Sequence, residues 1–161
     1  MIGIFNWALF IYALLQLGCQ NNTASKLIPF TVGDNQFAYI NGKGKTPFET
    51  KFSIAQCFSE GLAIASPLGE HPGIGFINGK GVFVIPPVYS DATPFNEGIA
   101  IVYADNTSIQ AIDKTGKVLF SLPDANVAGS FSEGLAPFAV LSGNYLKWGF
   151  VDKTGKIVIA A

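Results

Sequence analysis

Apolar residues are distributed differently on the two sides of residue 26. Residues 1–18 are apolar at all but two positions and carry no charged side chain, and a polar stretch follows at once. This pattern is typical of a signal peptide, because a bilayer-spanning helix requires about 20 apolar residues. Further along, short apolar runs alternate with glycine and proline, and no helical period persists for three turns. We therefore expect a leader over residues 1–19, a polar tether over 20–26 and an almost wholly β domain over 27–161.

Two sequence blocks recur in this domain with a period of about 36 residues. The first block reads FSEGLA at 58–63, FNEGIA at 95–100 and FSEGLA at 131–136. The second block reads YINGKGK at 39–45, FINGKGV at 76–82, AIDKTGK at 111–117 and FVDKTGK at 150–156. The domain also begins within the pattern, since LIPFTV at 27–32 resembles LAPFAV at 135–140. The predicted units are residues 27–61, 62–98, 99–134 and 135–161.

The fold class predicted from these units is an all-β tandem repeat array. Each unit of about 36 residues holds three to four short antiparallel strands and is too small to bury its apolar faces alone, so neighbouring units must stack. Several strands are apolar on both alternating faces, which suits elements covered on both sides. A proline pair at Pro86 and Pro87 should end one strand and leave residues 88–94 extended, edge-like or in a loop. Propeller-like and solenoid-like arrangements both remain open.

The second block has the signature of a hairpin turn. Asp at the first position and Gly at the fourth, as in Asp113 to Gly116, predict a type I turn whose glycine is left-handed and forms a bulge. The Asn-Gly pairs of the first two copies leave a two-residue turn open, but their alignment with the Asp copies favours the longer turn. The closing glycines of the four copies are Gly44, Gly81, Gly116 and Gly155.

The first block predicts a second tight turn, formed by Ser or Asn followed by Glu and Gly. Its structural residues are Glu60, Gly61, Glu97, Gly98, Glu133 and Gly134. The three glutamates are the only carboxylates that recur at one place, so a catalytic or metal-binding role has to be weighed. Their position beside turn glycines, once per unit, favours capping of backbone amides instead.

The combination of KWGFVDKTGK at 147–156 with FSEGLA resembles the bacterial WG (KWG) repeat family over residues 27–161. The resemblance implies a β-repeat architecture and non-catalytic binding or scaffolding roles, often in exported proteins. Only the last unit has the Trp-Gly pair. The aligned positions elsewhere hold Phe37-Ala38, Ile74-Gly75 and Ile109-Gln110.

The amino-acid composition further restricts the partners, metal sites and reactions that we expect for this chain. Ten lysines, no arginine and eleven acidic residues leave a net charge of −1, which argues against a nucleic-acid partner. A single histidine and two cysteines provide little for a metal site or a histidine-based triad, so we expect no metal, no cofactor and no enzymatic activity. Length varies between units in loops, and the candidate contact residues in or near them are His71, Tyr103 and Tyr145. Expected core anchors are Phe58, Phe95, Phe131 and Trp148.

The two cysteines bear on localisation. Gly18 followed by Cys19 resembles the lipobox of bacterial lipoproteins, although Leu15 lies one step too early and no lysine or arginine precedes the run. We predict lipidation at Cys19, with an uncleaved membrane anchor or an ordinary secretory signal as alternatives. Cys57 is then either a buried small hydrophobe or a reactive thiol, and its place beside Phe58 favours burial without a disulfide framework.

The function predicted from the sequence is that of a non-catalytic binding or scaffolding module at the bacterial cell envelope. It would be an outer-membrane or periplasmic lipoprotein attached through its lipid or leader, with a secreted protein as the alternative. Its partner would be a protein or a glycan. The competing function is a receptor for glycans or small ligands that uses a pocket between units, and an enzyme is a distant third.

Overall fold

The structure is a computed structural model that describes residues 27–70, 72–104 and 108–161. The predicted leader, the tether, Cys19 and His71 lie outside these residues. Every regular element among them is a strand, and none of them belongs to a helix long and apolar enough to cross a membrane. The expectation of an all-β repeat domain is therefore confirmed.

The strands follow one another in chain order with short connections. They are β1 (Leu27–Gly33), β2 (Gln36–Asn41), β3 (Phe52–Ala55), β4 (Ala63–Pro67), β5 (Ile74–Ile77), β6 (Phe83–Tyr89), β7 (Asp91–Ala92), β8 (Ile99–Tyr103), β9 (Ile109–Asp113), β10 (Val118–Leu122), β11 (Val127–Ala128), β12 (Leu135–Ser142), β13 (Tyr145–Asp152) and β14 (Ile157–Ile159).

Three antiparallel sheets hold these strands. The first sheet has the order β1-β2-β3-β4-β5-β6, the second β10-β9-β8-β7 and the third β11-β12-β13-β14. The recurring element is a four-stranded meander, with the β1–β2 hairpin added to the first sheet through the single pair Phe37 and Phe52. Each predicted unit contains three or four strands. The unit boundaries nevertheless fall inside sheets, because the strand before each Glu-Gly turn pairs with the strand after it, as Ala92 does with Val102.

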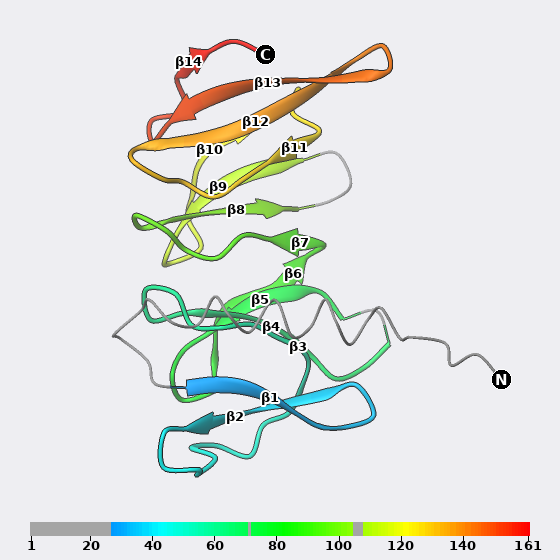
Figure 1. The fold of residues 1–161 in the computed structure, drawn as a ribbon, viewed down its shortest axis with the longest axis vertical. Coiled ribbons are helices and arrows are strands. Elements are labelled where there is room, and N and C mark those ends of the chain that lie inside the picture. The colour runs from blue at the N-terminus through cyan, green and yellow to red at the C-terminus, as the bar shows by residue number, and fades with distance from the viewer. Residues whose placement is uncertain (1–26, 71, 105–107) are drawn as a thin grey trace, which may run out of the picture.

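The described sheets stack in a row along the long axis of the molecule, with β1 and β2 towards one end and β14 at the other (Figure 1). One core cluster, around Phe95, lies between the first and second sheets, and another, around Phe131, lies between the second and third. A further cluster around Tyr39 joins the β1–β2 hairpin to the rest of the first sheet. Strands apolar on both faces are thus covered on both faces, which is why one unit cannot fold without a neighbour.

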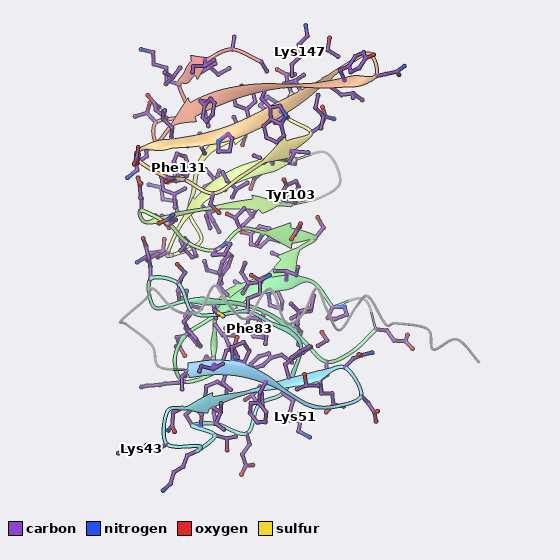
Figure 2. The ribbon with its side chains drawn as sticks, viewed as in Figure 1. Lys43, Lys51, Phe83, Tyr103, Phe131 and Lys147 are labelled. Carbon is purple, nitrogen blue, oxygen red and sulfur yellow. The ribbon has the colours of Figure 1, made fainter. Side chains whose placement is uncertain are left out.

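The repeated phenylalanines anchor these cores. Phe58 packs against Tyr39 with ring centroids 5.2 Å apart, and Phe95 packs against Phe76 at 4.8 Å. Phe131, which Figure 2 labels within the stack, packs edge-on against Phe120. Their predicted role as core anchors is confirmed.

Trp148 departs from that prediction. Its side chain is 53% exposed rather than part of a core. The residue lies on β13 in the last sheet of the described array, where no further sheet covers the outer face. The residue type predicted a buried side chain, but at this position in the array no other described sheet covers it.

Both predicted turn types are present. In each Glu-Gly turn the two central residues have positive φ, as with Glu60 at 51° and Gly61 at 89°, which is the conformation of a type I′ turn. In the second block, Gly116 is left-handed and its amide donates to the Asp113 carbonyl at 2.9 Å. The Asn copies form the same longer turn, with the Gly81 amide donating to the Asn78 carbonyl at 2.9 Å.

Glycine in the Trp-Gly pair avoids a steric clash with the backbone of the neighbouring strand. A Cβ on Gly149 would lie 2.5 Å from the Ile159 carbonyl oxygen, and one on Gly75 would lie 2.5 Å from the Ile85 carbonyl oxygen. At both places the register between the two strands is irregular. Gln110 occupies the aligned position in the second sheet, where it pairs regularly with Ser121, so a side chain is accommodated there.

The proline pair does not end its strand, contrary to expectation. β6 runs through Pro86 and Pro87 to Tyr89, which pairs with Ile74. β6 is an edge strand of the first sheet, so the missing proline amides leave no ladder bond broken.

Candidate functional site

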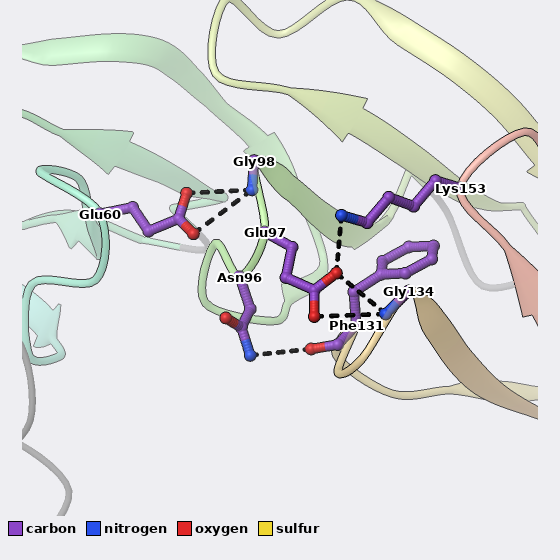
Figure 3. Close-up of polar contacts among 7 residues, drawn as sticks. All are labelled: Glu60, Asn96, Glu97, Gly98, Phe131, Gly134 and Lys153. Carbon is purple, nitrogen blue, oxygen red and sulfur yellow. Dashed lines mark hydrogen bonds and ion pairs between the residues drawn. The ribbon is translucent and has the colours of Figure 1, made fainter.

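The repeated glutamates connect each sheet to the next. The Glu60 carboxylate accepts hydrogen bonds from the Gly98 amide, at 3.0 and 3.3 Å for its two oxygens, and pairs with Lys114 Nζ at 2.9 Å. One sheet further on, Glu97 accepts from the Gly134 amide at 3.0 and 3.3 Å and pairs with Lys153 Nζ at 2.6 Å. Figure 3 shows both glutamates reaching from their own turn to the equivalent turn of the following sheet.

A second bond accompanies each glutamate. The Ser59 hydroxyl donates to the Phe95 carbonyl at 2.6 Å, and the Asn96 side-chain amide donates to the Phe131 carbonyl at 2.8 Å. These contacts and the glutamate contacts together form what we call a staple between successive sheets. The predicted capping of backbone amides has the right chemistry, but the capped amides belong to the neighbouring sheet, a pairing that local sequence does not reveal.

The staple favours ionised glutamates. For Glu60, desolvation raises the pKa, but the hydrogen bond and charge of Lys114 and the Gly98 amide outweigh it, so the pKa is lowered overall. The Lys153 hydrogen bond is the main cause of the lowered pKa of Glu97, and the Gly134 amide adds to it. Both carboxylates are therefore anionic acceptors over the neutral pH range.

The backbone at these glutamates is unusual for their residue type. Glu60, Glu97 and Glu133 have φ of 51°, 54° and 52°, a left-handed conformation that glycine or asparagine adopts more readily. Glutamate at such a position indicates that its side chain has a role beyond the turn itself. For Glu60 and Glu97, the contacts across to the next sheet are that role.

We predict that the array loses stability on acidification. A carboxylate with a lowered pKa in the folded state stabilises the fold above its ordinary value of 4.5, and that stability is lost as pH falls through the folded value. The midpoint of urea unfolding should therefore decrease between about pH 5 and pH 3. In the double variant Glu60→Gln and Glu97→Gln this decrease should be clearly smaller, leaving the part due to Asp113 and Asp152, whose pKa values are also lowered. If the unfolding midpoints of the two proteins decreased equally as the pH falls, the glutamate contacts would not stabilise the array.

The acidic side chains of the staple do not gather into a metal-binding cluster within the described residues. There, no group of three or more His, Cys, Asp or Glu side chains could hold a metal ion. Glu60 and Glu97 each serve a separate pair of sheets and are bound to backbone amides and lysines. Their chemistry is that of acceptors in a structural contact.

The candidate contact residues have different surroundings. The Tyr103 hydroxyl donates to the Ala128 carbonyl at 3.2 Å and accepts from the Ala128 amide at 3.0 Å, so it connects the second and third sheets. Tyr145, at the tip of the β12–β13 hairpin, is 79% exposed. His71 lies outside the described residues. Of the two tyrosines, Tyr145 has the side chain available to a partner.

Exposed apolar side chains gather on the third sheet. One of its faces packs against the second sheet through Phe138 and Val151, which are buried. Alternate residues point the opposite way, and cross-strand pairing places them on one outer face. We call this the terminal face, and its exposed members are Leu141, Leu146, Trp148, Phe150 and Ile159.

Cys57 does not behave as the sequence led us to expect. It is half-buried and disulfide-bonded, rather than a fully buried thiol outside any bridge. The apolar neighbours that favoured burial do surround it in sequence, but Cys57 lies in the connection between β3 and β4 and not in a strand facing a core.

Comparisons with known proteins agree with this architecture. The family model described as "WG containing repeat" matches residues 37–66, 74–107 and 148–161. No curated protein matches the chain in sequence. Among solved structures, the computationally designed Ika8 protein is similar in fold, with a TM-score of 0.57 at 14% identity. The similarity covers 85% of this chain and 46% of the designed chain, so this chain spans about half the length of that protein. The matched segments, together with the recurring meander and its two turn types, show that the chain belongs to the WG-repeat family.

Proposed function

We propose that this protein is a non-catalytic binding module of the bacterial cell envelope and that its β12–β13 hairpin contacts the partner. The WG-repeat family supports a repeat-type binding module. The observation that carries the proposal is the length of this hairpin. β12 and β13 have eight residues each, whereas β8 and β9 have five, and the hairpin extends beyond the sheet beneath it (Figure 1).

The hairpin tip has the composition of a contact site. Tyr145 and Leu141 are 79% and 56% exposed, and the tip turn carries Gly143 with a φ of 63°. A tyrosine supplies a large contact area together with a hydroxyl for hydrogen bonding, and it has few rotamers to lose on binding. Partner contact at such a projecting loop is how repeat arrays commonly act.

We predict that Tyr145→Ala weakens capture of the envelope partner about tenfold, the loss typical of a moderate interface hot spot. The measurement is quantitative pull-down of envelope proteins by the purified array, followed by titration of the captured protein. Val84→Ala is the control, because Val84 is an exposed apolar residue on a different sheet. Equal affinities of the Tyr145 and Val84 variants would refute the assignment of the hairpin.

The same variants test the competing function. A receptor for glycans or small ligands would be stabilised by a soluble ligand, so a raised melting temperature in a sugar screen would indicate that class. If Tyr145→Ala abolished that stabilisation, the hairpin would be a sugar-binding element, and the proposed protein contact would be wrong.

Attachment through a lipid on Cys19 is part of this proposal, as a state distinct from the one described above, in which Cys57 is disulfide-bonded. The chain has two cysteines, so a thioether at Cys19 and a bridge between Cys19 and Cys57 exclude each other in one molecule. Both require export, because disulfides persist in oxidising compartments and lipoproteins are acylated at the membrane. Export is therefore common to the two states, and the acyl group distinguishes them.

We predict that palmitate labels the wild-type protein and the Cys57→Ser variant but not Cys19→Ser. Labelling is measured by gel autoradiography after expression in a bacterium that processes lipoproteins. Absence of label from the wild type, or equal label in Cys19→Ser, would remove the lipid anchor. A wild-type protein in which alkylation finds no reactive thiol before reduction, and which carries no label, would identify the bridged, secreted alternative.

A further inference from the structure

The described lysines gather on one edge of the array. Both turn types join strands at the same ends, and the staples bring the turns of successive sheets together, as where Glu60 binds Lys114 of the following sheet. We call the side formed by these turns the turn edge, on which Figure 2 labels Lys43. Seven of the nine described lysines lie there, within the second sequence block. Five of the seven make no ion pair within the described residues, namely Lys43, Lys45, Lys80, Lys117 and Lys156.

Most carboxylates of the turn edge are already engaged by the protein itself. Glu60 and Glu97 bind a lysine and an amide in the staples. Asp113 and Asp152 each accept hydrogen bonds from amides of their own turns, at 2.8 Å from Thr115 and 2.9 Å from Thr154. The unpaired lysine side chains are exposed. The turn edge therefore presents ammonium groups to the outside.

The opposite ends of the strands have the reverse balance of charge. The described acidic residues there outnumber the lysines, with Asp34, Glu70, Asp91 and Asp124 against Lys51 and Lys147. On the turn edge, seven lysines stand against five carboxylates. The net charge of −1 for the whole chain thus combines a basic edge with an acidic one.

Exposed aliphatic side chains adjoin the lysines of the turn edge. Near the start of β6 and of β10, the register with the neighbouring strand skips one residue, which is Val84 in β6 and Leu119 in β10. Such a bulge directs the side chain of the extra residue away from the regular alternation of the strand. Val84 and Leu119 are each 43% exposed, and Val82, beside them, is 58% exposed. A following sheet is present for both strands, so this exposure does not depend on where the array ends.

We propose that the turn edge binds the surface of an anionic phospholipid bilayer. The ammonium groups would meet lipid phosphates, and Val84 and Leu119 would reach the boundary of the acyl chains. A lysine near an anionic membrane strengthens binding about fivefold, and several of them act together. The neighbouring aliphatic side chains favour a bilayer over a soluble polyanion, which would contact the lysines and leave the apolar side chains in water.

This orientation suits the proposed contact hairpin without depending on it. Tyr145 lies at the tip of the β12–β13 hairpin, at the ends of the strands opposite the turns. An array bound to a bilayer through its turn edge would direct Tyr145 away from the lipid. Membrane binding is measured in the absence of the envelope partner, so either proposal can fail while the other stands.

The test measures binding of the full chain to sedimented vesicles. Every protein carries Cys19→Ser and is kept reduced, so that neither an acyl chain nor a disulfide contributes. The vesicles are phosphatidylcholine alone or an equal mixture of phosphatidylcholine and phosphatidylglycerol. Binding to the first kind measures the contribution that needs no anionic lipid, including that of the apolar residues 1–18.

We expect Lys80→Gln combined with Lys117→Gln to weaken binding to the mixed vesicles at least about tenfold, because two ammonium groups leave the lipid surface. Binding to phosphatidylcholine alone should not change. The matched control is Lys51→Gln combined with Lys147→Gln, which removes the same charge from the opposite ends of the strands. Its effect should stay below about twofold, since charges more than a Debye length from the lipid are screened. Equal losses for the two pairs would overturn the assignment of the turn edge.

Leu119→Asn tests the apolar part of the contact. It should weaken binding to the mixed vesicles about threefold, because less apolar area leaves water, while the melting temperature stays unchanged. If Leu119→Asn bound as well as its parent, and the Lys80 and Lys117 double variant lost dextran sulfate as strongly as vesicles, the partner would be a soluble polyanion and the bilayer assignment would be wrong. A parent protein that binds both kinds of vesicle equally would also refute it.

Discussion

Replacing Phe95 by alanine is expected to destabilise the array by about 3–5 kcal/mol, as for other fully buried phenylalanines. Phe95 is fully buried between the first and second sheets and packs on Phe76 with ring centroids 4.8 Å apart. Its removal leaves a cavity lined by residues of both sheets, and the strands on either side are held by their own ladders and cannot collapse into it. Urea unfolding followed by far-ultraviolet circular dichroism measures the loss.

The matched control is Phe150→Ala. Phe150 aligns with Phe76, the partner of Phe95 in that contact, but its side chain is 36% exposed on the terminal face, where no described sheet packs on it. Its truncation should cost about 1 kcal/mol, because little apolar area returns to water and no closed cavity forms. If the two substitutions destabilised the protein equally, the stacking of sheets would not be the source of stability.

The second large effect is expected for Gly75→Ala, at about 3 kcal/mol, the upper end of the usual cost of overpacking. A Cβ at this position would lie 2.5 Å from the Ile85 carbonyl oxygen and 2.8 Å from the backbone at Pro86 and Pro87. These atoms are backbone, so relief requires β6 to move away from β5, which weakens the ladder between them. The change should appear as a lower midpoint of urea unfolding.

Gly79→Ala separates this steric effect from a general cost of losing glycine. Gly79 lies in the hairpin turn after β5, has no positive φ, and a Cβ there would meet no atom within 4 Å. We expect that variant to be within about 0.5 kcal/mol of the natural protein, as for most surface substitutions. A Gly75 variant as stable as the Gly79 variant would show that β6 yields easily and that the glycine of the Trp-Gly pair has no steric role here.

The Glu-Gly turns show most clearly which features could be predicted from the sequence and which could not. Ser59, Glu60 and Gly61 indicate a tight turn because a side-chain oxygen and a glycine determine the local backbone within a few residues. The carboxylate partner could not be predicted, since Gly98 lies 38 residues away and the distance between them depends on how two sheets stack. The recurrence of glutamate once per unit was the available signal for such a contact.

The surroundings of Tyr103 and Trp148 could not be predicted from the sequence either. Tyr103 immediately precedes a connection whose length varies between the units, yet its hydroxyl binds Ala128 of the next sheet. Trp148 has the residue type and the flanking pattern of a core anchor, yet it is 53% exposed. Neither outcome follows from the residue or its neighbours in sequence, because exposure depends on whether another layer covers the position.

The sequence by itself determined the local structure of this protein: its period, its two turn types, its short strands and the need for apolar faces to be covered. Each of these depends on side chains within a few residues, where turn chemistry and alternation act directly on the backbone. Only the tertiary structure decided that glutamates staple one sheet to the next and that, among the described residues, the outer face of the last sheet is exposed. Those features depend on contacts between units, and identical motifs have different surroundings according to whether a neighbour is present.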